Sequence, residues 1–327
     1  MMPLPRFALA RPGSLEEAAR LLSDAGAEGR VLAGGTDLLV NLKHGLAAPR
    51  LLVSIDRLPE LRGVSVDDAG ALVVGAAERL ADIAAQVLVR ARAPAIAGAA
   101  GLAAHPQARN MGTLGGNVCL DVRCRYVNRT PLWRGSLGGC LKAEGDVCHV
   151  VPGGKNCMAA LSGDTVAPLV ALDAKAHLVS ASAERWVSIE ALRGKDGRTP
   201  VALQPGELVR AVRIPAAPPN RRSAYLKWAV RHAVDFPLVA VALVVDAGAD
   251  GAIESLRVVA SVLGPKPRVV AGLDRFRGER ITPQLASAVA EQVTRQCVPL
   301  PNVLYDPQHR RRRLGVMVRR QLDAWVG

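Results

Sequence analysis

Six cysteines are the residues of this sequence whose type and position suggest chemistry. Five of them are crowded together and the sixth is distant: Cys119, Cys124, Cys140, Cys148, Cys157 and Cys297. The first residues of the chain lack the apolar core of a secretory signal, so we expect a cytoplasmic protein. In a reducing compartment, such crowding favours metal binding or redox chemistry over disulfides.

The last four crowded cysteines follow the pattern Cys-x15-Cys-x7-Cys-x8-Cys, which is not a Cys-x-x-Cys zinc or ferredoxin pattern. Their segment has little regular apolar periodicity, so packing alone would not easily offset its loss of conformational entropy. Four thiolates bound to one metal centre would cross-link it. Thiolates suit zinc, which would brace the segment, or an iron-sulfur cluster, which would pass electrons. The spacing leaves both possibilities open.

Two glycine turns are the second feature with chemical potential, at residues 33–37 (Ala-Gly-Gly-Thr-Asp) and 110–117 (Asn-Met-Gly-Thr-Leu-Gly-Gly-Asn). Glycine lets backbone N–H groups approach phosphate oxygens, because no Cβ intervenes and positive φ is tolerated. Two such turns suit a dinucleotide. Each one alone is typical of an ordinary tight turn, and the chain lacks the Rossmann and P-loop glycine patterns. The pattern alone does not decide the function.

The elements that must position these residues are a mixture of helices and strands. Ser14 and Glu17 form the pattern of a capping box before a helix that reaches Leu22. We expect strands at 30–33, 51–55, 71–75, 176–180, 208–214, 238–245 and 253–262, and helices from residue 80, at 166–172, at 282–296 and at the C-terminus. Residues 98–164 lack a steady apolar period, which predicts a long functional loop.

The composition excludes several classes of protein. With 50% hydrophobic and 22% charged residues the chain is typical of a folded globular protein, and it has no apolar run long enough for a membrane helix. The net charge of +13 is densest at Arg310–Arg313, but aromatic residues are only 3% and no nucleic-acid motif appears. These arginines lie on a helical pattern with an apolar stripe, so we expect a solvated or subunit-contacting face. No hydrolase triad or metalloprotease motif stands out, and we predict no catalytic side chains.

Three motifs, in this order, resemble the FAD subunit or domain of xanthine dehydrogenase and carbon monoxide dehydrogenase: residues 31–37, 109–117 and 164–173. The resemblance spans essentially the whole chain. It implies an α+β fold, with a two-part FAD-binding domain of the vanillyl-alcohol-oxidase-like (PCMH) type and a C-terminal α+β domain like the CO dehydrogenase flavoprotein C-terminal domain. The implied domains are residues 1–57, residues 58–220 with an insertion at about 118–160, and residues 221–327.

The resemblance also implies which residues contact the cofactor. In this family both glycine loops bind the FAD pyrophosphate, and the acidic residue that opens the third motif lies near the flavin nucleotide. Lys227 resembles a family lysine near the cofactor, although a solvent-facing lysine on a strand is an equal alternative. The expected cofactor-binding residues are Val31, Leu32, Ala33, Gly34, Gly35, Thr36, Asp37, Leu38, Asn110, Gly112, Thr113, Leu114, Gly115, Gly116, Asn117, Asp164 and Lys227.

The cysteine segment carries a narrower resemblance. Ordinary members of the family are much shorter between Asn117 and Asp164, whereas residues 119–124, 140–142 and 146–150 look like the β subunit of 4-hydroxybenzoyl-CoA reductases, which holds a 4Fe-4S cluster on this insertion. The resemblance implies four metal ligands: Cys124, Cys140, Cys148 and Cys157. We expect Cys119 and Cys297 to be small buried hydrophobes, and His149 is a candidate substitute ligand.

Together these resemblances imply an electron-transfer subunit with FAD and a 4Fe-4S cluster. Its partners would be a 2Fe-2S small subunit and a molybdopterin large subunit, in a heterotrimer that pairs into a dimer, and a ferredoxin-like electron donor or acceptor. Neither nucleic acid nor a membrane is an expected partner. The alternatives are an FAD subunit of another molybdenum hydroxylase with a different aromatic or heteroaromatic substrate, a flavin-free scaffold protein, and a basic nucleic-acid-binding protein that uses the C-terminal arginines.

Overall fold

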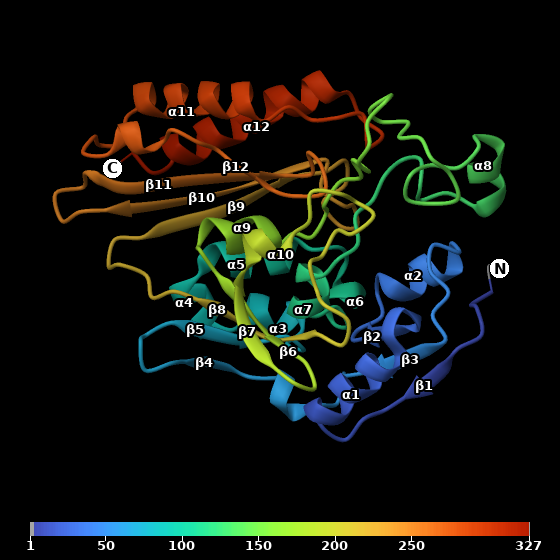
Figure 1. The fold of residues 1–327 in the computed structure, drawn as a ribbon. Helices are drawn as coiled ribbons and strands as arrows, with labels where there is room; N and C mark the ends of the chain where they lie inside the picture. Colours follow the sequence, from blue (N-terminus) through green and yellow to red (C-terminus); the bar gives the residue numbers. More distant parts are fainter. Residues whose placement is uncertain (1–2, 327) are drawn as a thin grey trace.

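The computed structural model describes residues 3–326, which form three β-sheets with helices between and around them (Figure 1). The sheets follow one another along the chain, in residues 8–54, 64–214 and 222–269. The predicted mixture of helix and sheet is therefore present. The exact bounds of the three domains stay a prediction, because a sheet does not by itself set where a domain ends.

The first sheet is small and parallel, with the strand order β1-β3-β2. Its elements are β1 (Ala8–Ala10), α1 (Leu15–Ala25), β2 (Gly29–Leu32), α2 (Leu38–Lys43) and β3 (Leu51–Ser54). The Ser14 hydroxyl accepts a hydrogen bond from the Glu17 N–H at 3.1 Å, as predicted. The capping box is only half formed, however, because the Glu17 carboxylate accepts from the Gly13 N–H at 2.7 Å rather than from that of Ser14.

The second sheet is antiparallel, with the order β4-β5-β8-β6-β7. Its strands are β4 (Val64–Val66), β5 (Leu72–Gly75), β6 (Lys175–Val179), β7 (Glu184–Ser188) and β8 (Leu208–Ile214). Because β8 lies between β5 and β6, the end of this region closes back on its beginning. The connection from β5 to β6 carries the second glycine turn and all five crowded cysteines.

That connection is more helical than the sequence predicted. Its helices are α3 (Leu80–Ala85), α4 (Val87–Arg92), α5 (Pro94–Leu102), α6 (Pro106–Arg109), α7 (Leu114–Val118), α8 (Pro131–Ser136) and α9 (Val166–Ala171), and α10 (Ile189–Leu192) follows β7. Within residues 98–164 the helices are too short to show an apolar period, which is why the sequence indicated a loop. Threonine hydroxyls begin two of them: Thr113 caps α7 and Thr130 caps α8.

The third sheet is antiparallel and is covered on both faces. Its elements are β9 (Arg222–Trp228), β10 (Val239–Ala247), β11 (Ile253–Ser261), β12 (Arg268–Val269), α11 (Pro283–Gln296) and α12 (Pro307–Asp323). Helices α11 and α12 lie on one side of the sheet and α5 and α9 on the other (Figure 1). Strand β10 is therefore buried on both faces, which explains its continuous apolar sequence.

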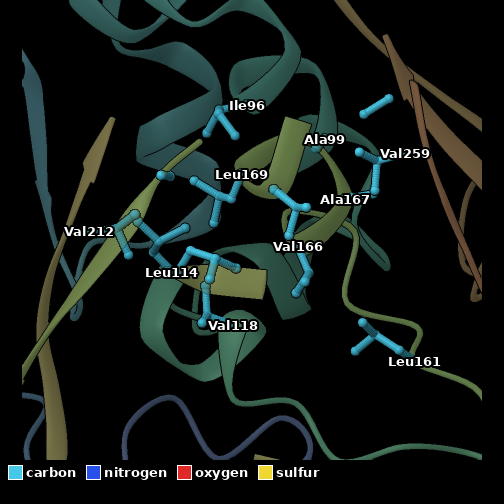
Figure 2. Packing of buried hydrophobic residues seen from close by; sticks show 14 of the residues in the cluster. Ile96, Ala99, Leu114, Val118, Leu161, Val166, Ala167, Leu169, Val212 and Val259 are labelled. Atoms are coloured by element: carbon cyan, nitrogen blue, oxygen red, sulfur yellow. The ribbon is translucent and has the colours of Figure 1, made fainter. Parts of the chain in front are cut away.

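The main hydrophobic core joins the second and third sheets. Ile96 of α5, Leu169 of α9 and Val212 of β8 converge in it, together with Leu114 and Val118 of α7 (Figure 2). Leu114 and Val118 are fully buried. Burying side chains of this size stabilises a fold by about 1.5–3 kcal/mol each. The core thus fixes α7, the helix that begins in the second glycine turn, by its apolar face.

Arg310 is the main departure from the predicted C-terminal helix. The apolar stripe of α12 packs on the third sheet as expected, with Leu314, Val318 and Leu322 fully buried. Arg310, expected on a solvated or subunit-contacting face, is instead fully buried within the chain, and it donates to the carbonyls of Leu238, Leu300 and Val262. Burial lowers the pKa of its guanidinium to about 10, so it remains charged at neutral pH. Arg310 therefore anchors α12 through these three buried hydrogen bonds instead of facing solvent.

Replacing this anchor is expected to destabilise the fold. In Arg310→Met the three carbonyls lose their donor, and each buried acceptor left without a partner costs about 1–3 kcal/mol, so the free energy of unfolding should fall by about 2 kcal/mol or more. The matched control is Arg312→Met, at an exposed position two residues along the same helix. This control should change the free energy of unfolding little. Urea denaturation measures both variants, and equal stability of the two would contradict the anchor.

Candidate cofactor site

A cavity of about 730 Å³ lies where the first sheet meets the second. Its size is within the range of small-molecule and cofactor pockets. Much of its wall comes from three separate parts of the chain: residues 33–38 after β2, residues 112–117 except Leu114 around the start of α7, and most of residues 198–209 leading into β8. Both glycine turns therefore face the same space.

The first glycine turn connects β2 to α2 and touches the second turn directly. A Cβ atom on Gly34 would lie 1.8 Å from the Met111 carbonyl oxygen, so only glycine fits at this position. Gly35 has φ +70°, which glycine adopts readily and other residues do not. The first glycine is needed for the close approach of two backbones and the second for the bend of the turn.

The second glycine turn is held against the loop between β5 and α3. The Leu80 N–H donates to the Gly112 carbonyl at 2.9 Å, and the Gly115 N–H donates to the Ala76 carbonyl at 2.8 Å. The Thr113 hydroxyl accepts from the Gly116 N–H at 3.2 Å and so caps α7. Because Gly115 has no side chain, α7 approaches Ala76 closely. These bonds fix the turn before any ligand arrives.

The structure places most, but not all, of the expected cofactor residues on the cavity wall. Those on the wall are Val31, Ala33, Gly34, Gly35, Thr36, Asp37, Leu38, Gly112, Thr113, Gly115, Gly116 and Asn117. Five others do not line the cavity: Leu32, Asn110, Leu114, Asp164 and Lys227. Leu114 points into the core, because it belongs to the apolar face of α7. The function of every residue in this set as a cofactor contact stays a prediction.

Asp164 and Lys227 are brought together, but away from the cavity. The Lys227 Nζ lies 3.1 Å from Asp164 Oδ1, which also accepts from the Tyr225 hydroxyl at 2.8 Å. Burial raises the pKa of the Asp164 carboxyl, although Lys227 and Tyr225 both oppose the rise. Lys227 is not the solvent-facing lysine of the alternative interpretation, since its side chain is only 6% exposed. The pair links β9 to the turn before α9.

Asn117 connects the second turn to the third motif. Its Oδ1 accepts from both the N–H and the hydroxyl of Thr165, at 2.9 and 2.7 Å. Gly163 packs on the same residue, because a Cβ there would lie 2.6 Å from the Asn117 carbonyl oxygen. The motifs at 110–117 and 164–173 are therefore in contact, and Asn117 is both part of the cavity wall and a structural link.

Asp37 connects the first turn to the cysteine segment. Its carboxylate lies 2.5 Å from the Arg123 guanidinium and also accepts from the Asn41 side-chain amide at 3.0 Å. Burial raises the pKa of Asp37, and the charge of Arg123 opposes this rise. Arg123 in turn lies over the Phe236 ring, 4.3 Å from its centroid. One ion pair thus joins the glycine turn, the cysteine segment and the loop between β9 and β10.

The four cysteines expected to bind metal lie inside the segment rather than on its surface. Cys124, Cys148 and Cys157 are buried and Cys140 is partly buried, and all four are free thiols. The pKa of the Cys124 thiol is raised to about 11, mainly by burial and in smaller part by the nearby Cys157 and Cys140. Burial also raises the pKa of the Cys157 thiol, and the nearby Cys140 and Cys148 add to this rise. Cys140 is therefore close to both Cys124 and Cys157, and Cys148 is close to Cys157.

Cys119, Cys297 and His149, which were not predicted as the four metal ligands, lie in other surroundings. Cys119 is partly buried and lines the cavity, so it is more exposed than the buried hydrophobe that the sequence predicted. Cys297 is fully buried in the core under α11, as predicted. His149 Nε2 lies 2.7 Å from the Gly139 carbonyl oxygen, and its ring packs beside Tyr126. Across residues 3–326, no group of three or more His, Cys, Asp or Glu side chains is arranged to hold a single metal ion.

Residues 198–209 and two residues between the cysteines are parts of the site that the sequence did not indicate. The wall includes Asp121 and Lys142, whose ammonium lies 2.8 Å from the Asp121 carboxylate. The loop before residue 198 touches the cysteine segment, because the Cys157 N–H donates to the Asp196 carboxylate at 3.0 Å. Only the tertiary fold brings these residues to the cavity, and no local motif marks them.

No helix in the described part of the chain is long and apolar enough to cross a membrane.

Comparisons with known proteins agree with this geometry. A family model for the FAD binding domain in molybdopterin dehydrogenase matches residues 5–217, and one for the CO dehydrogenase flavoprotein C-terminal domain matches residues 224–324. The carbon monoxide dehydrogenase medium chain of Hydrogenophaga pseudoflava is 28% identical over 99% of this chain and 98% of its own length. The aldehyde oxidoreductase FAD-binding subunit of Escherichia coli K12 is 32% identical over 68% of this chain and 72% of its own.

The fold agrees as well. A solved structure of carbon monoxide dehydrogenase from Hydrogenophaga pseudoflava, in a form that lacks the Mo-pyranopterin moiety, superposes with a TM-score of 0.79 at 26% identity, and the match covers 99% of both chains. The predicted two-part FAD-binding fold with a CO dehydrogenase-type C-terminal domain is thereby confirmed. This chain belongs to the FAD-binding medium subunits of the molybdenum hydroxylases, of the CO dehydrogenase and xanthine dehydrogenase type.

Proposed function

We propose that this chain is the FAD- and 4Fe-4S-containing electron-transfer subunit of a complex similar to molybdenum-dependent 4-hydroxybenzoyl-CoA reductase. In this role the chain relays electrons between a ferredoxin-like protein and the 2Fe-2S and molybdenum subunits, for reductive removal of a phenolic hydroxyl from an aromatic acyl-CoA. The observation that carries the proposal is the cavity wall, which combines both glycine turns with residues from between the cysteines.

The cavity suits FAD in size and in chemistry. The first glycine turn leaves room for a ligand beside the backbone N–H groups of Gly34 and Gly35, which is what a pyrophosphate requires. The N–H groups of Gly112, Gly115 and Gly116 in the second turn are already bonded within the protein, so this turn contributes its shape and its side chains. Hydroxyl and amide side chains on the same wall, Thr36 and Asn117 among them, are suited to the remaining phosphate or ribityl oxygens. We propose that residues 33–38 and 112–117 hold the dinucleotide at these two turns.

The cysteine segment suits a cluster that takes four thiolates. Cys157 and Cys140 contribute to the raised pKa of Cys124, and Cys140 and Cys148 contribute to that of Cys157, whereas the raised pKa of Cys119, which faces the cavity, is due to its burial and is opposed by Arg193. This difference supports the choice of these four as ligands. Lys142 lowers the pKa of Cys157 against the effect of burial, which favours the thiolate that metal binding needs.

The two groups supply complementary chemistry: FAD exchanges electrons singly or in pairs, and an iron-sulfur cluster passes one at a time. The chain's own residues contribute binding, spacing and exclusion of water. The segment that carries the cysteines also contributes Asp121 and Lys142 to the cavity wall, so the two sites share a boundary. A shared boundary is what a relay between two cofactors needs.

The names of the relatives support a complex of several subunits, because they describe a medium chain and FAD-binding subunits. We propose a small subunit with 2Fe-2S clusters and a large molybdopterin subunit, in a heterotrimer that forms a dimer. The second candidate is the FAD subunit of another molybdenum hydroxylase. The names of the relatives favour this second candidate, because they cover carbon monoxide, xanthine, an aldehyde and nicotine. Subunits of this family therefore serve enzymes with varied substrates.

Cofactor content provides the first test of this proposal. Protein purified without oxygen should show a flavin absorption spectrum with broad iron-sulfur absorption beneath it, and about four irons per FAD. Metal analysis and quantification of released flavin measure both. Zinc in place of iron would contradict the cluster, and a colourless protein would favour the flavin-free scaffold.

The ligand set can be tested by substitution. Cys148→Ser should lose most of the iron while it keeps FAD, because a hydroxyl is a poor replacement for a thiolate ligand. Cys119→Ala is the matched control from the same segment, and we expect it to retain iron. Iron content and the electron paramagnetic resonance signal of the reduced protein distinguish the two variants. Equal iron in both would exclude Cys148 as a ligand.

The contact between the glycine turns gives a further prediction. In Gly34→Ala the new methyl group overlaps the Met111 backbone, and overpacking of this kind costs about 1–3 kcal/mol. The turns must separate, so FAD affinity should fall together with stability. Gly98→Ala is the control, because a Cβ there meets nothing within 4 Å. Fluorescence titration with FAD should separate the two variants, and wild-type affinity in Gly34→Ala would disprove the role of this contact.

A further inference from the structure

Three cationic side chains line the cavity within the described residues, and they differ in what they already bind. Arg30 donates to the carbonyls of Ala27 and Gly29 on its own turn. Arg198 donates from both Nε and Nη2 to Asp196 Oδ2, and from Nη2 also to the Lys155 carbonyl. Lys142 is the one that comes from the cysteine segment, two residues after Cys140.

Lys142 has a hydrogen-bond donor to spare. Its Nζ donates to Asp121 Oδ1 at 2.8 Å and to the Gly197 carbonyl at 2.6 Å. An ammonium group has three N–H donors, and the described residues provide acceptors for two of them. The side chain is only 10% exposed, so water has limited access to the third donor. A cation in this position favours an anionic oxygen inside the cavity.

The position of Asp121 indicates which part of a dinucleotide would supply that oxygen. Asp121 lies close to the first glycine turn, since it is two residues before Arg123, whose guanidinium lies 2.5 Å from the Asp37 carboxylate of that turn. Lys142, bonded to Asp121, is therefore on the side of the cavity near the first glycine turn, where the N–H groups of Gly34 and Gly35 are not bonded to other described residues. Those N–H groups suit phosphate, so the nearby ammonium faces the same part of the ligand.

We propose that Lys142 binds a phosphate oxygen of FAD through its third N–H, and thereby couples the cysteine segment to flavin binding. The inference rests on the proposed function and adds to it a cationic phosphate ligand that neither glycine turn supplies. The coupling has a direct structural route. The Gly197 carbonyl accepts from Lys142, and Gly197 packs closely on Cys157. A Cβ atom on Gly197 would lie 2.7 Å from the Cys157 sulfur.

The experiment measures FAD affinity in the whole chain with its iron content intact. Lys142→Met should raise the Kd for FAD between about tenfold and about a hundredfold, which is the loss expected for one charge-assisted hydrogen bond. Lys142→Arg, which keeps the charge, should lose less affinity than Lys142→Met. Lys155→Met is the matched control, an exposed lysine of the same segment that does not line the cavity, and it should bind FAD as the wild type does.

Two further measurements separate a phosphate contact from a purely structural brace. Thermal unfolding of flavin-free and FAD-saturated protein should show that FAD stabilises Lys142→Met less than it stabilises the wild type. The absorption maximum of bound flavin should be unchanged, because the contact is with phosphate and not with the ring. A variant that is destabilised without FAD yet binds FAD normally would overturn the inference, and so would a shifted absorption maximum.

A substitute is available if Lys142→Met does not fold. Lys142→Gln retains an amide that can donate to Asp121 and Gly197 but carries no charge, so it should show the same loss of FAD affinity. Wild-type affinity in Lys142→Gln would overturn the inference. A wild-type chain that binds no FAD would remove the proposed function and this inference together, whereas normal FAD binding by wild type and variants alike removes this inference alone.

Discussion

The site depends on the contact between the Gly34 backbone and the Met111 carbonyl. At this point two turns from different parts of the chain touch without any side chain between them. The first turn belongs to the parallel sheet of residues 8–54, and the second is bonded to the loop between β5 and α3. The cavity therefore exists only while these two units are docked, since its wall takes residues from both. Protein interiors are closely packed, so even one added methyl group at the contact must move a backbone. A purely local glycine turn would not have this sensitivity.

The C-terminal sheet is joined to this site through buried polar groups as well as through the apolar core. Asp164, Tyr225 and Lys227 form one such group, and Arg310 with its three carbonyl acceptors forms another. Asn302 extends the second group, because its side-chain amide donates to the Met158 carbonyl next to Cys157. Val262, one of the acceptors of Arg310, has φ +69°, a conformation that β-branched residues rarely adopt. Buried charges are tolerated where every partner is in place, and the exact pairing fixes how the sheet sits on the cysteine segment.

Much of this arrangement was predictable from local sequence. The strand predicted at 208–214 matches β8, and the turn residues Gly34, Gly35, Gly115 and Gly116 face one cavity. Glycine turns and strand periodicity are local signals, which explains their success. Residues 198–209 could not be assigned to the site, because they reach the cavity only through the pairing of β8 with β5 and β6. Arg310 was predicted on a solvated or subunit-contacting face for a similar reason, because the sequence does not show the neighbouring carbonyls that bind an arginine inside the fold. Tertiary contacts decided both cases.

The cysteine segment illustrates how a region with little apolar periodicity becomes ordered. Val122, Val127 and Val150 are buried, but they are scattered rather than periodic. Much of the remaining attachment is electrostatic: Arg123 pairs with Asp37, Lys142 with Asp121, and Arg134 with Glu144. Arg134 also donates to the His44 carbonyl at the end of α2, so two of these arginines connect the segment to the first sheet. Partly buried ion pairs hold the segment while leaving polar groups on the wall of the cavity. An apolar segment would have placed neither Asp121 nor Lys142 on the wall of the cavity beside the cysteines.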